Sequence, residues 1–215
     1  MMPRQIRPLA LLAMLAFGSV GCSASPGAAT PAPVPSEAGG GGGNGDCPTS
    51  QPAALPAGES RTVTIATDLG TMTLKIEADL SPIAAGNFVA LAECGFYDGV
   101  VFHRVVPQFV IQGGDPTGTG SGGPGYTIKD EPVTAKYGRG TVAMARTEAP
   151  DSVGSQFFIV VDDKAVEALA YYNTYQIIGS VTSGIETADA IVEAAKGVQI
   201  PTDPVAMNDV SVSNP

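Results

Sequence analysis

Residues 102–115 read FHRVVPQFVIQGGD, and this stretch decides the fold. It contains two short runs of alternating residues separated by Pro107. Alternation with a period of two is typical of half-buried strands, and proline at the break favours a turn. A second segment, MARTEAPDSVGSQFFI over residues 144–159, follows later in the chain and ends in another apolar run. The first stretch therefore predicts two short strands joined by a turn, and the second a further strand.

Further strands are expected on both sides of these segments. Val63 and Ile65 alternate with polar residues before a turn at residues 68–70, and Met72, Leu74 and Ile76 alternate after it, which predicts a hairpin. Runs with the same patterning predict strands at 100–106, 109–113, 141–145, 156–161, 176–181 and near 205–212.

Two helices are expected within the same region. Ser81 is a favourable N-cap and Pro82 a favourable first helical residue, so a helix should begin there and end at Gly95. Residues 184–196 place five apolar residues on one helical stripe: Ile185, Ala188, Ile191, Val192 and Ala195. The patterns together predict a mostly β domain with two helices, spanning residues 61–215.

The N-terminus is typical of an export signal. Arg4 and Arg7 precede an uncharged, apolar stretch over residues 8–21, which is too short to span a bilayer as a helix. We therefore interpret residues 1–21 as a signal peptide. Residues 19–23, SVGCS, resemble the lipobox of bacterial lipoproteins, in which Cys22 would carry the lipid. A plain secretory signal without lipid is the alternative.

Residues 22–60 predict a tether rather than a folded unit. Pro31, Pro33 and Pro35 alternate with small residues, and residues 39–43 are all glycine. Such a segment has too few large apolar side chains to offset the entropy of ordering, so it should hold the domain off a membrane surface. The expected location is the extracytoplasmic side of the cell membrane, or the exported space if Cys22 is not lipidated.

The cysteine count and the charge narrow the chemistry. If lipid occupies Cys22, Cys47 and Cys94 remain as an even pair in an oxidising compartment, which predicts one disulfide; two free thiols are the alternative. The net charge is −10 and the acidic residues are scattered, which argues against a nucleic-acid partner. His103 is the only histidine, so no histidine cluster for zinc exists. The sequence GTGSGG at 118–123 matches a phosphate-binding pattern, but Pro124 follows instead of a helix, which favours a loop.

The segments at 102–115 and 144–159, taken in order, resemble the cyclophilins, which are peptidyl-prolyl cis/trans isomerases. The resemblance runs from about Thr62 to Val212. It implies a closed eight-stranded antiparallel β-barrel capped by two α-helices, with no cofactor and no metal. The implied partners are proline-containing segments of unfolded or partly folded exported proteins, and a monomer is expected. A slow or inactive module that binds or chaperones proline segments is the alternative function.

Catalysis of X-Pro rotation requires an enzyme that binds the twisted amide better than either planar form. Arg104 is the natural donor to the prolyl nitrogen, because its guanidinium stays charged and presents a rigid fork of N–H groups. The resemblance gives Arg104 this role, with Gln112 orienting it and Phe109 beside the same site as catalytic residues. An isolated strand arginine would more commonly cover a surface or pair with a carboxylate.

The resemblance also implies a set of substrate-binding residues. Phe158 and Val110, with Phe109, would form the proline pocket. Ala145 and Arg146 would border the extended peptide, although the Arg146 side chain could equally be solvated, and Gln156 would line a neighbouring groove. Within residues 169–175 the alignment leaves two options for the wall, Tyr171 or Leu169, and places Tyr175 beside the pocket.

Overall fold

The computed structural model describes residues 46–214. The predicted signal peptide over residues 1–21, the lipid attachment at Cys22 and most of the predicted tether lie outside the described residues. Within residues 46–214, no helix is long and apolar enough to cross a membrane.

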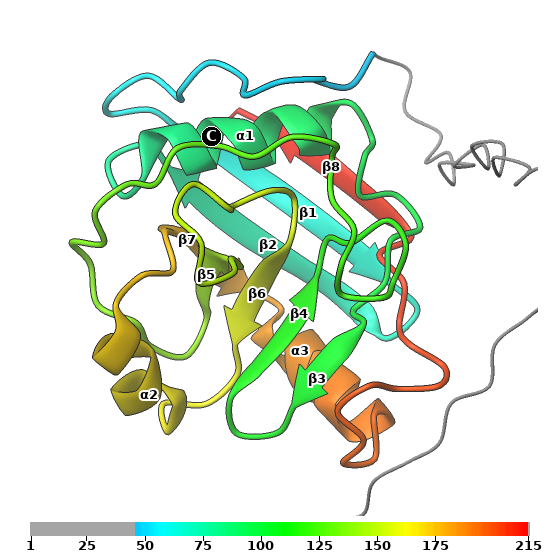
Figure 1. The fold of residues 1–215 in the computed structure, drawn as a ribbon. Coiled ribbons are helices and arrows are strands. Elements are labelled where there is room, and N and C mark those ends of the chain that lie inside the picture. Colours follow the sequence, from blue (N-terminus) through cyan, green and yellow to red (C-terminus); the bar gives the residue numbers. More distant parts are fainter. Residues whose placement is uncertain (1–45, 215) are drawn as a thin grey trace, which may run out of the picture. The chain divides into compact units, whose positions relative to one another are not determined.

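In the described part of the chain, eight antiparallel strands form one sheet, which confirms the predicted strand content (Figure 1). The strands are β1 (Ser60–Thr67), β2 (Gly70–Glu77), β3 (Arg104–Val106), β4 (Val110–Gly113), β5 (Thr141–Met144), β6 (Phe157–Val160), β7 (Ile177–Ser183) and β8 (Asp209–Ser213). Their order across the sheet is β3-β4-β6-β5-β7-β2-β1-β8. The sheet therefore brings the two sequence segments that carry the motifs, on β3–β4 and on β5–β6, next to each other.

The predicted closed barrel is wrong, because the sheet is a curled half-barrel that stays open between β3 and β8. The segments just before these two strands do meet, through a single bridge between Val101 and Ala206 and a few hydrogen bonds such as Phe102 N–H to the Val205 carbonyl (2.9 Å). Strand β3 has only three residues, so its edge is too short to form a ladder with β8.

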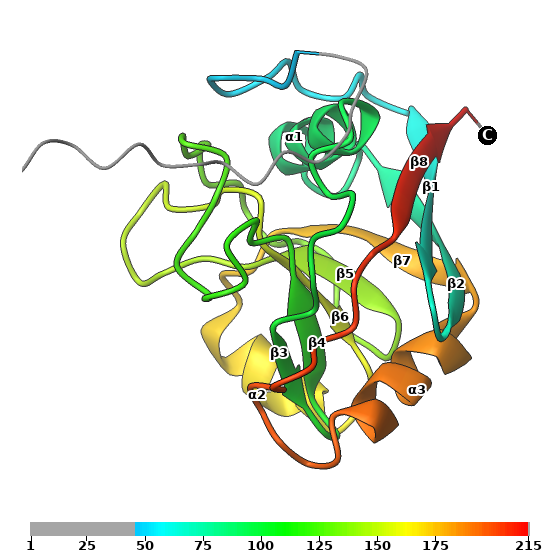
Figure 2. The ribbon, with the colours of Figure 1, turned by 90° about the vertical axis from the view of Figure 1, so that its right-hand side faces the viewer.

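Residues 46–214 form three helices instead of the predicted two. Helices α1 (Pro82–Glu93) and α3 (Ile185–Ala194) lie where the sequence predicted them. Figures 1 and 2 show α1 over the β1, β2, β8 side and α3 at the opposite end of the sheet. The additional helix α2 (Ala165–Tyr172) has eight residues and buries only Ala165 and Leu169. Two buried positions one turn apart make too weak a periodic signal to reveal a helix in the sequence.

The N-terminus of α1 is capped differently from the sequence prediction. Ser81 occupies the N-cap position, but its hydroxyl makes no capping hydrogen bond. The carboxylate of Glu131, from a distant loop, instead accepts hydrogen bonds from the N–H groups of Ile83 and Ala84, both at 2.9 Å. A carboxylate at this end also interacts favourably with the helix dipole. The same Glu131 accepts a bond from Gln176 Nε2 (3.3 Å), so it ties α1 to the segment before β7.

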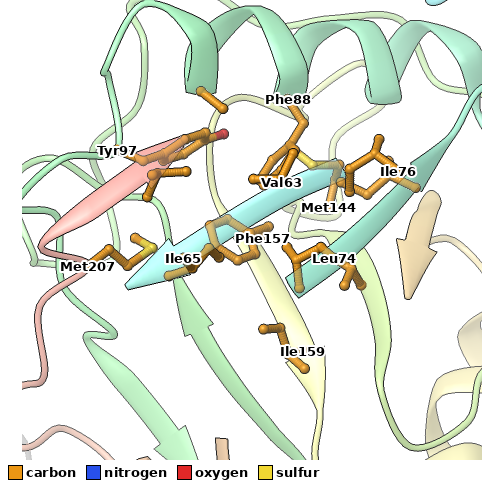
Figure 3. Close-up of a cluster of buried hydrophobic side chains, with 14 of the residues drawn as sticks. Val63, Ile65, Leu74, Ile76, Phe88, Tyr97, Met144, Phe157, Ile159 and Met207 are labelled. Carbon is orange, nitrogen blue, oxygen red and sulfur yellow. The ribbon is translucent and has the colours of Figure 1, made fainter. Parts of the chain in front are cut away.

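The main core lies between the concave face of the sheet and α1 (Figure 3). Phe157 is at its centre, with its ring 5.1 Å from that of Phe88 and 5.6 Å from that of Tyr97. Side chains of β1 and β2, including Ile65 and Leu74, close the core from the sheet side. Burying a phenylalanine completely is worth about 1.5–3 kcal/mol, so this ring cluster fixes β6 firmly in place.

A second apolar cluster lies on the other face of β4, β5 and β6. It consists of Val110, Tyr137, Ala143, Phe158, Val160, Ala165, Leu169 and Ile177. Strands β5 and β6 are buried along their whole length, because the core covers one face and α2 with residues 133–137 covers the other. This second cluster is where the candidate site forms.

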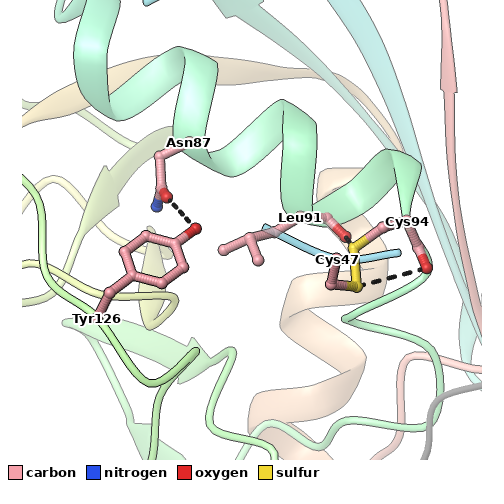
Figure 4. Close-up of a disulfide and its surroundings, with 5 residues drawn as sticks. All are labelled: Cys47, Asn87, Leu91, Cys94 and Tyr126. Atoms are coloured by element: carbon pink, nitrogen blue, oxygen red, sulfur yellow. Dashed lines mark hydrogen bonds between the residues drawn. A yellow bond between two sulfur atoms is a disulfide. The ribbon is translucent and has the colours of Figure 1, made fainter. Parts of the chain in front are cut away.

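Residues 47–59, which the sequence assigned to the tether, lie against α1 instead. A disulfide joins Cys47 to Cys94 at the C-cap of α1, the pair that the cysteine count predicted (Figure 4). Leu55 is buried, and its N–H donates to the carbonyl of Pro82 (2.9 Å). The packed region therefore begins about a dozen residues before the predicted boundary, because the disulfide and Leu55 hold this arm on the helix.

We predict that loss of this disulfide destabilises the fold. The bridge closes a sequence separation of 47 residues, for which the chain-entropy model gives about 4 kcal/mol as an upper-range value. The double variant Cys47→Ser, Cys94→Ser should therefore unfold at a clearly lower urea concentration than the oxidised protein. Wild-type protein kept in reductant is the matched control and should unfold with the double variant. An unchanged urea midpoint in both would contradict a stabilising role.

Candidate active site

The site is built on one row of residues that runs across four strands. Arg104 on β3 is directly opposite Gln112 on β4, Gln112 is opposite Phe158 on β6, and Phe158 is opposite Ala143 on β5. Residues directly opposite each other in antiparallel strands project to the same face, with Cβ atoms about 5 Å apart. The register alone therefore places the cation of Arg104 and the ring of Phe158 on one surface, with the Gln112 amide between them.

A small pocket of about 140 Å³ opens on this surface. Its lining consists of Arg104, Phe109, Val110, Gln112, Ala145, Arg146, Phe158, Leu169 and Tyr175, all of which the sequence analysis named. Sites that bury a drug-sized ligand measure roughly 300–1,000 Å³, so this pocket suits a single small ring. The structure thus brings together one cation and an apolar concavity of the size that one side chain would fill.

The turn between β3 and β4 places Phe109 at the pocket. Only three residues separate the paired Val106 and Val110, and Gln108 among them has a positive φ of 60°. A residue in the left-handed region allows the chain to reverse this tightly. This conformation is uncommon for residues other than glycine and asparagine. Phe109 follows directly, and its N–H donates to the Val106 carbonyl (3.1 Å), which fixes its position beside the pocket.

Leu169, and not Tyr171, forms the wall that the alignment left open. Leu169 is 2% exposed and lines the pocket, whereas Tyr171 is 83% exposed and does not. The prediction of Tyr171 as a pocket residue is therefore wrong, because α2 turns its Leu169 face toward the sheet and leaves Tyr171 in solvent. Tyr175 completes the wall, with its ring edge-on to Phe158 at 5.4 Å.

A chain of side-chain amides orients the Arg104 guanidinium. Arg104 Nη1 donates to Gln112 Oε1 (3.2 Å), and Gln112 Nε2 donates to Gln156 Oε1 (3.0 Å). Gln156 Nε2 then donates to the backbone carbonyls of Gly120 (3.0 Å) and Gly122 (2.9 Å). The guanidinium is therefore held from one side, and the orientation of each amide depends on the next.

A larger groove of about 680 Å³ adjoins the pocket and shares Gln112, Ala145 and Arg146 with it. Its remaining lining comes from Gly120–Thr127, Thr147, Ser152 and Gly154–Gln156. Gln156 lies in this groove, as the sequence predicted. The backbone N–H of Ala145 already donates to the Gln156 carbonyl (2.8 Å), so this N–H is engaged within the protein.

Arg146 holds the loop beside the groove, and its side chain is not solvated. The side chain is only 12% exposed and forms an ion pair with Asp130 at 3.0 Å. It also donates through Nε to the Thr147 carbonyl (3.1 Å) and through Nη2 to the Ala149 carbonyl (2.8 Å). Because its donors are directed into the loop, we assign Arg146 a structural role at the boundary between pocket and groove.

Two ionisable side chains next to the site, His103 and Asp115, have lowered pKa values. Burial lowers the pKa of His103, so this imidazole is neutral at pH 7. Burial alone would raise the pKa of Asp115, but hydrogen bonds from the Gly122 N–H and from Thr117 outweigh it and lower the pKa to about 2. Among residues 46–214, no three His, Cys, Asp or Glu side chains gather where they could hold a metal ion.

Sequence reasoning missed several residues that support the pocket. Tyr137 is buried and donates from its hydroxyl to the Tyr175 carbonyl (2.8 Å), while Ala143 and Ile177 form the floor beneath Phe158. Burial raises the pKa of Tyr137 to about 12, so it stays a donor. The apolar runs at 141–145 and 176–181 contain Ala143 and Ile177 but did not show which face each residue takes, and no predicted element contains Tyr137.

Comparisons with known proteins agree with this geometry. Residues 62–212 match the family model described as cyclophilin type peptidyl-prolyl cis-trans isomerase/CLD. The chain is 48% identical over 122 residues to peptidyl-prolyl cis-trans isomerase B of Bacillus subtilis, a match that covers 53% of this chain and 80% of that protein. It is 42% identical over 127 residues to peptidyl-prolyl cis-trans isomerase CYP65 of Arabidopsis thaliana, covering 57% of this chain but only 20% of that longer protein.

A solved structure shares the fold. It is the crystal structure of a cyclophilin type peptidyl-prolyl cis-trans isomerase of Cryptosporidium parvum in the presence of the dipeptide Ala-Pro, with a TM-score of 0.64 and 33% identity. The match covers 72% of this chain and 99% of that one. The family model spans most of the chain and includes every residue of the pocket, so this chain belongs to the cyclophilin-type peptidyl-prolyl cis-trans isomerase family.

Proposed function

We propose that this chain is a peptidyl-prolyl cis/trans isomerase that accelerates rotation about X-Pro bonds. The observation that carries the proposal is the strand register that places the Arg104 fork beside a pocket sized for one ring. The related Cryptosporidium protein was crystallised in the presence of Ala-Pro, which is the kind of dipeptide that this pocket would take. Family membership and intact positions 104, 109, 112 and 158 support the same conclusion.

The mechanism follows from position and charge. The prolyl ring occupies the apolar pocket formed by Phe109, Val110, Phe158 and Leu169, while the acyl side of the X-Pro bond rotates. Rotation breaks the amide resonance, against a barrier of about 18–20 kcal/mol, and leaves a lone pair on the prolyl nitrogen. The Arg104 guanidinium donates to that lone pair, which exists only in the twisted state, and therefore lowers the barrier. No covalent bond forms between the enzyme and the substrate.

The alternative of a slow or inactive proline-binding module loses its main support. An incomplete wall at residues 169–175 would favour that alternative, because the pocket would then hold the proline ring poorly. Leu169 and Tyr175 line the pocket on this side. A complete wall favours turnover, because the ring must be held while the rest of the peptide rotates. A protease-free isomerisation assay on a short X-Pro peptide separates the two functions directly.

We predict that Arg104→Ala removes most of the catalysis and leaves the fold intact. Loss of one well-placed donor commonly lowers kcat by about 10²–10³-fold, and Arg104→Lys should also be poor because a point charge cannot replace the fork. The assay is two-dimensional exchange NMR on a tetrapeptide, with urea unfolding of each variant as the control for folding. Wild-type exchange rates in a folded Arg104→Ala variant would disprove the assignment.

The wall assignment gives a matched pair of variants on one helix. Leu169→Ala should raise KM for the tetrapeptide by about tenfold, because removal of a few methylene contacts from a pocket costs about 1–3 kcal/mol of binding. Tyr171→Ala removes a larger side chain two residues away, but it lies in solvent and should leave KM within twofold. The reverse result, with KM sensitive to Tyr171 and not to Leu169, would show that α2 faces the site differently in solution.

The proposed setting is outside the cytoplasm, at a membrane. The signal-like N-terminus, the lipobox-like SVGCS and the Pro/Gly-rich stretch that follows support an exported, lipid-anchored protein. Its substrates would be X-Pro bonds of unfolded or partly folded exported chains, where the uncatalysed step takes tens to hundreds of seconds. We propose that the enzyme acts as a monomer.

We predict that Cys22→Ser releases the protein from membranes. The variant loses the thiol that would carry the lipid, while the isomerase domain is unchanged. Fractionation of cells that express the wild type and the variant should place the wild type with the membranes and the variant in the soluble exported fraction. Mass spectrometry of the wild-type N-terminus provides the independent check. Membrane retention of Cys22→Ser, or an unmodified wild-type Cys22, would contradict lipid anchoring.

A further inference from the structure

The loop that follows β4 is held by a fully buried carboxylate. Asp115 has no exposed surface and accepts four close hydrogen bonds, from the Thr117 N–H (2.8 Å), the Thr117 hydroxyl (2.8 Å), the Gly120 N–H (2.6 Å) and the Gly122 N–H (3.0 Å). Its two oxygens thus gather the loop at residues 116–122 around one charge. Hydrogen bonds to a charged acceptor are roughly twice as strong as those between neutral groups, so they give the loop a defined shape.

The same two glycines are also held from the opposite side. Their N–H groups donate to Asp115, and their carbonyls accept from Gln156 Nε2 at 3.0 and 2.9 Å. The backbone of Gly120 and Gly122 therefore links the Asp115 carboxylate to Gln156, the first of the two side-chain amides that lead to Arg104. This link uses backbone groups only, so no side-chain motif in the sequence reveals it.

The loop also fixes the direction of the amide chain. Backbone carbonyls can only accept, so Gln156 must present its NH₂ group to the loop and its Oε1 to Gln112. Gln112 must then turn its NH₂ group toward Gln156, which leaves Oε1 as the acceptor facing Arg104. If Gln156 flipped, its oxygen would face two carbonyls and its NH₂ group would face the NH₂ of Gln112.

We propose that Asp115 is a positioning residue for the catalytic arginine, acting through Gly120, Gly122, Gln156 and Gln112. The proposal rests on the proposed isomerase function. Asp115 does not line the pocket, and its carboxylate is directed into the loop, so it touches no substrate. Its effect is to hold the loop carbonyls where they select the amide orientation that presents an acceptor to Arg104.

Two neighbouring glycines provide a matched test. A Cβ at Gly122 would collide with Asp115 Oδ1 and lie 2.8 Å from Thr117 Oγ1, so Gly122→Ala should force the carboxylate and the loop apart. A Cβ at Gly123 would meet nothing nearer than Ser155 Oγ at 4.0 Å, so Gly123→Ala should leave the loop in place. The two variants make the same chemical change one residue apart.

The expected result is a separation of kcat from KM. Gly122→Ala and Asp115→Asn should lower kcat for a tetrapeptide about tenfold, since a displacement of about 1 Å at a reacting group can cost up to about 100-fold. Their KM should stay within twofold, because the pocket walls are untouched. The Gln112 and Gln156 side-chain amide resonances should shift in Gly122→Ala and not in Gly123→Ala.

A third variant keeps the test informative if Gly122→Ala or Asp115→Asn does not fold. Gln156→Met breaks the chain at a partly exposed position outside the core and should also lower kcat. Combined with Gly122→Ala or Asp115→Asn, whichever folds, its effect should be less than additive, because both changes interrupt the same chain. Wild-type kcat in folded Asp115→Asn, Gly122→Ala or Gln156→Met overturns the proposal. No catalysis by the wild type would instead overturn the proposed function.

Discussion

The structure depends on one strand that is buried on both faces. Successive residues of β6 point in opposite directions, so Phe157 enters the core while Phe158 forms the pocket wall. Phe157 packs against the rings of Phe88 and Tyr97 (Figure 3), and also against the ring of Phe102. A shift of the β6 backbone that displaced Phe158 would therefore also displace Phe157 from this cluster. The rigidity of the pocket therefore comes from the core beneath it.

The polar part of the site depends on the same register. Gln112 pairs with Arg104 on one side and with Phe158 on the other, so the amide that orients the cation is fixed by the strand that carries the apolar wall. Burial lowers the pKa of the neighbouring His103, and at Asp115 the hydrogen bonds from the loop outweigh the effect of burial and lower the pKa. The site therefore keeps one charge state near pH 7, which suits a reaction that needs a fixed donor rather than proton transfer.

The long glycine-rich loop is attached to the rest of the molecule at several points. Tyr126 donates from its hydroxyl to Asn87 Oδ1 on α1 (2.8 Å; Figure 4). Asn87 Nδ2 in turn donates to the Gly154 carbonyl (2.9 Å). Tyr97 donates to the Ser155 carbonyl (2.9 Å) from within the core. Both segments that line the groove are thereby connected to α1, so a loop without regular secondary structure still presents fixed carbonyls to Gln156.

The sequence predicted the strands and two helices because alternation and helical period reflect burial on one face of an element. It named every residue of the pocket: seven lie in the two motif segments, and the resemblance supplied Leu169 and Tyr175. It failed where partners are distant in sequence: the Glu131 cap of α1, the packing of residues 47–59 and the choice of Leu169 over Tyr171. Each of these depends on which segments meet after folding. The closed barrel failed for a related reason, since strand count alone does not show whether the short edge of β3 reaches β8.

The attachment of the N-terminal arm matters for the proposed membrane setting. The arm is fixed by the disulfide at the C-terminal end of α1 and by Leu55 at the start of that helix. Helix α1 packs on β1, β2, β7 and β8, whereas the catalytic row begins on β3 and β4 at the other end of the sheet. A pull transmitted through the proposed tether would therefore act first on the disulfide and on α1, at the end of the strand order away from Arg104. If the chain is anchored as proposed, the Cys47–Cys94 bridge and not the short edge strand β3 would take the first load, which would leave Arg104 in its pairing with Gln112.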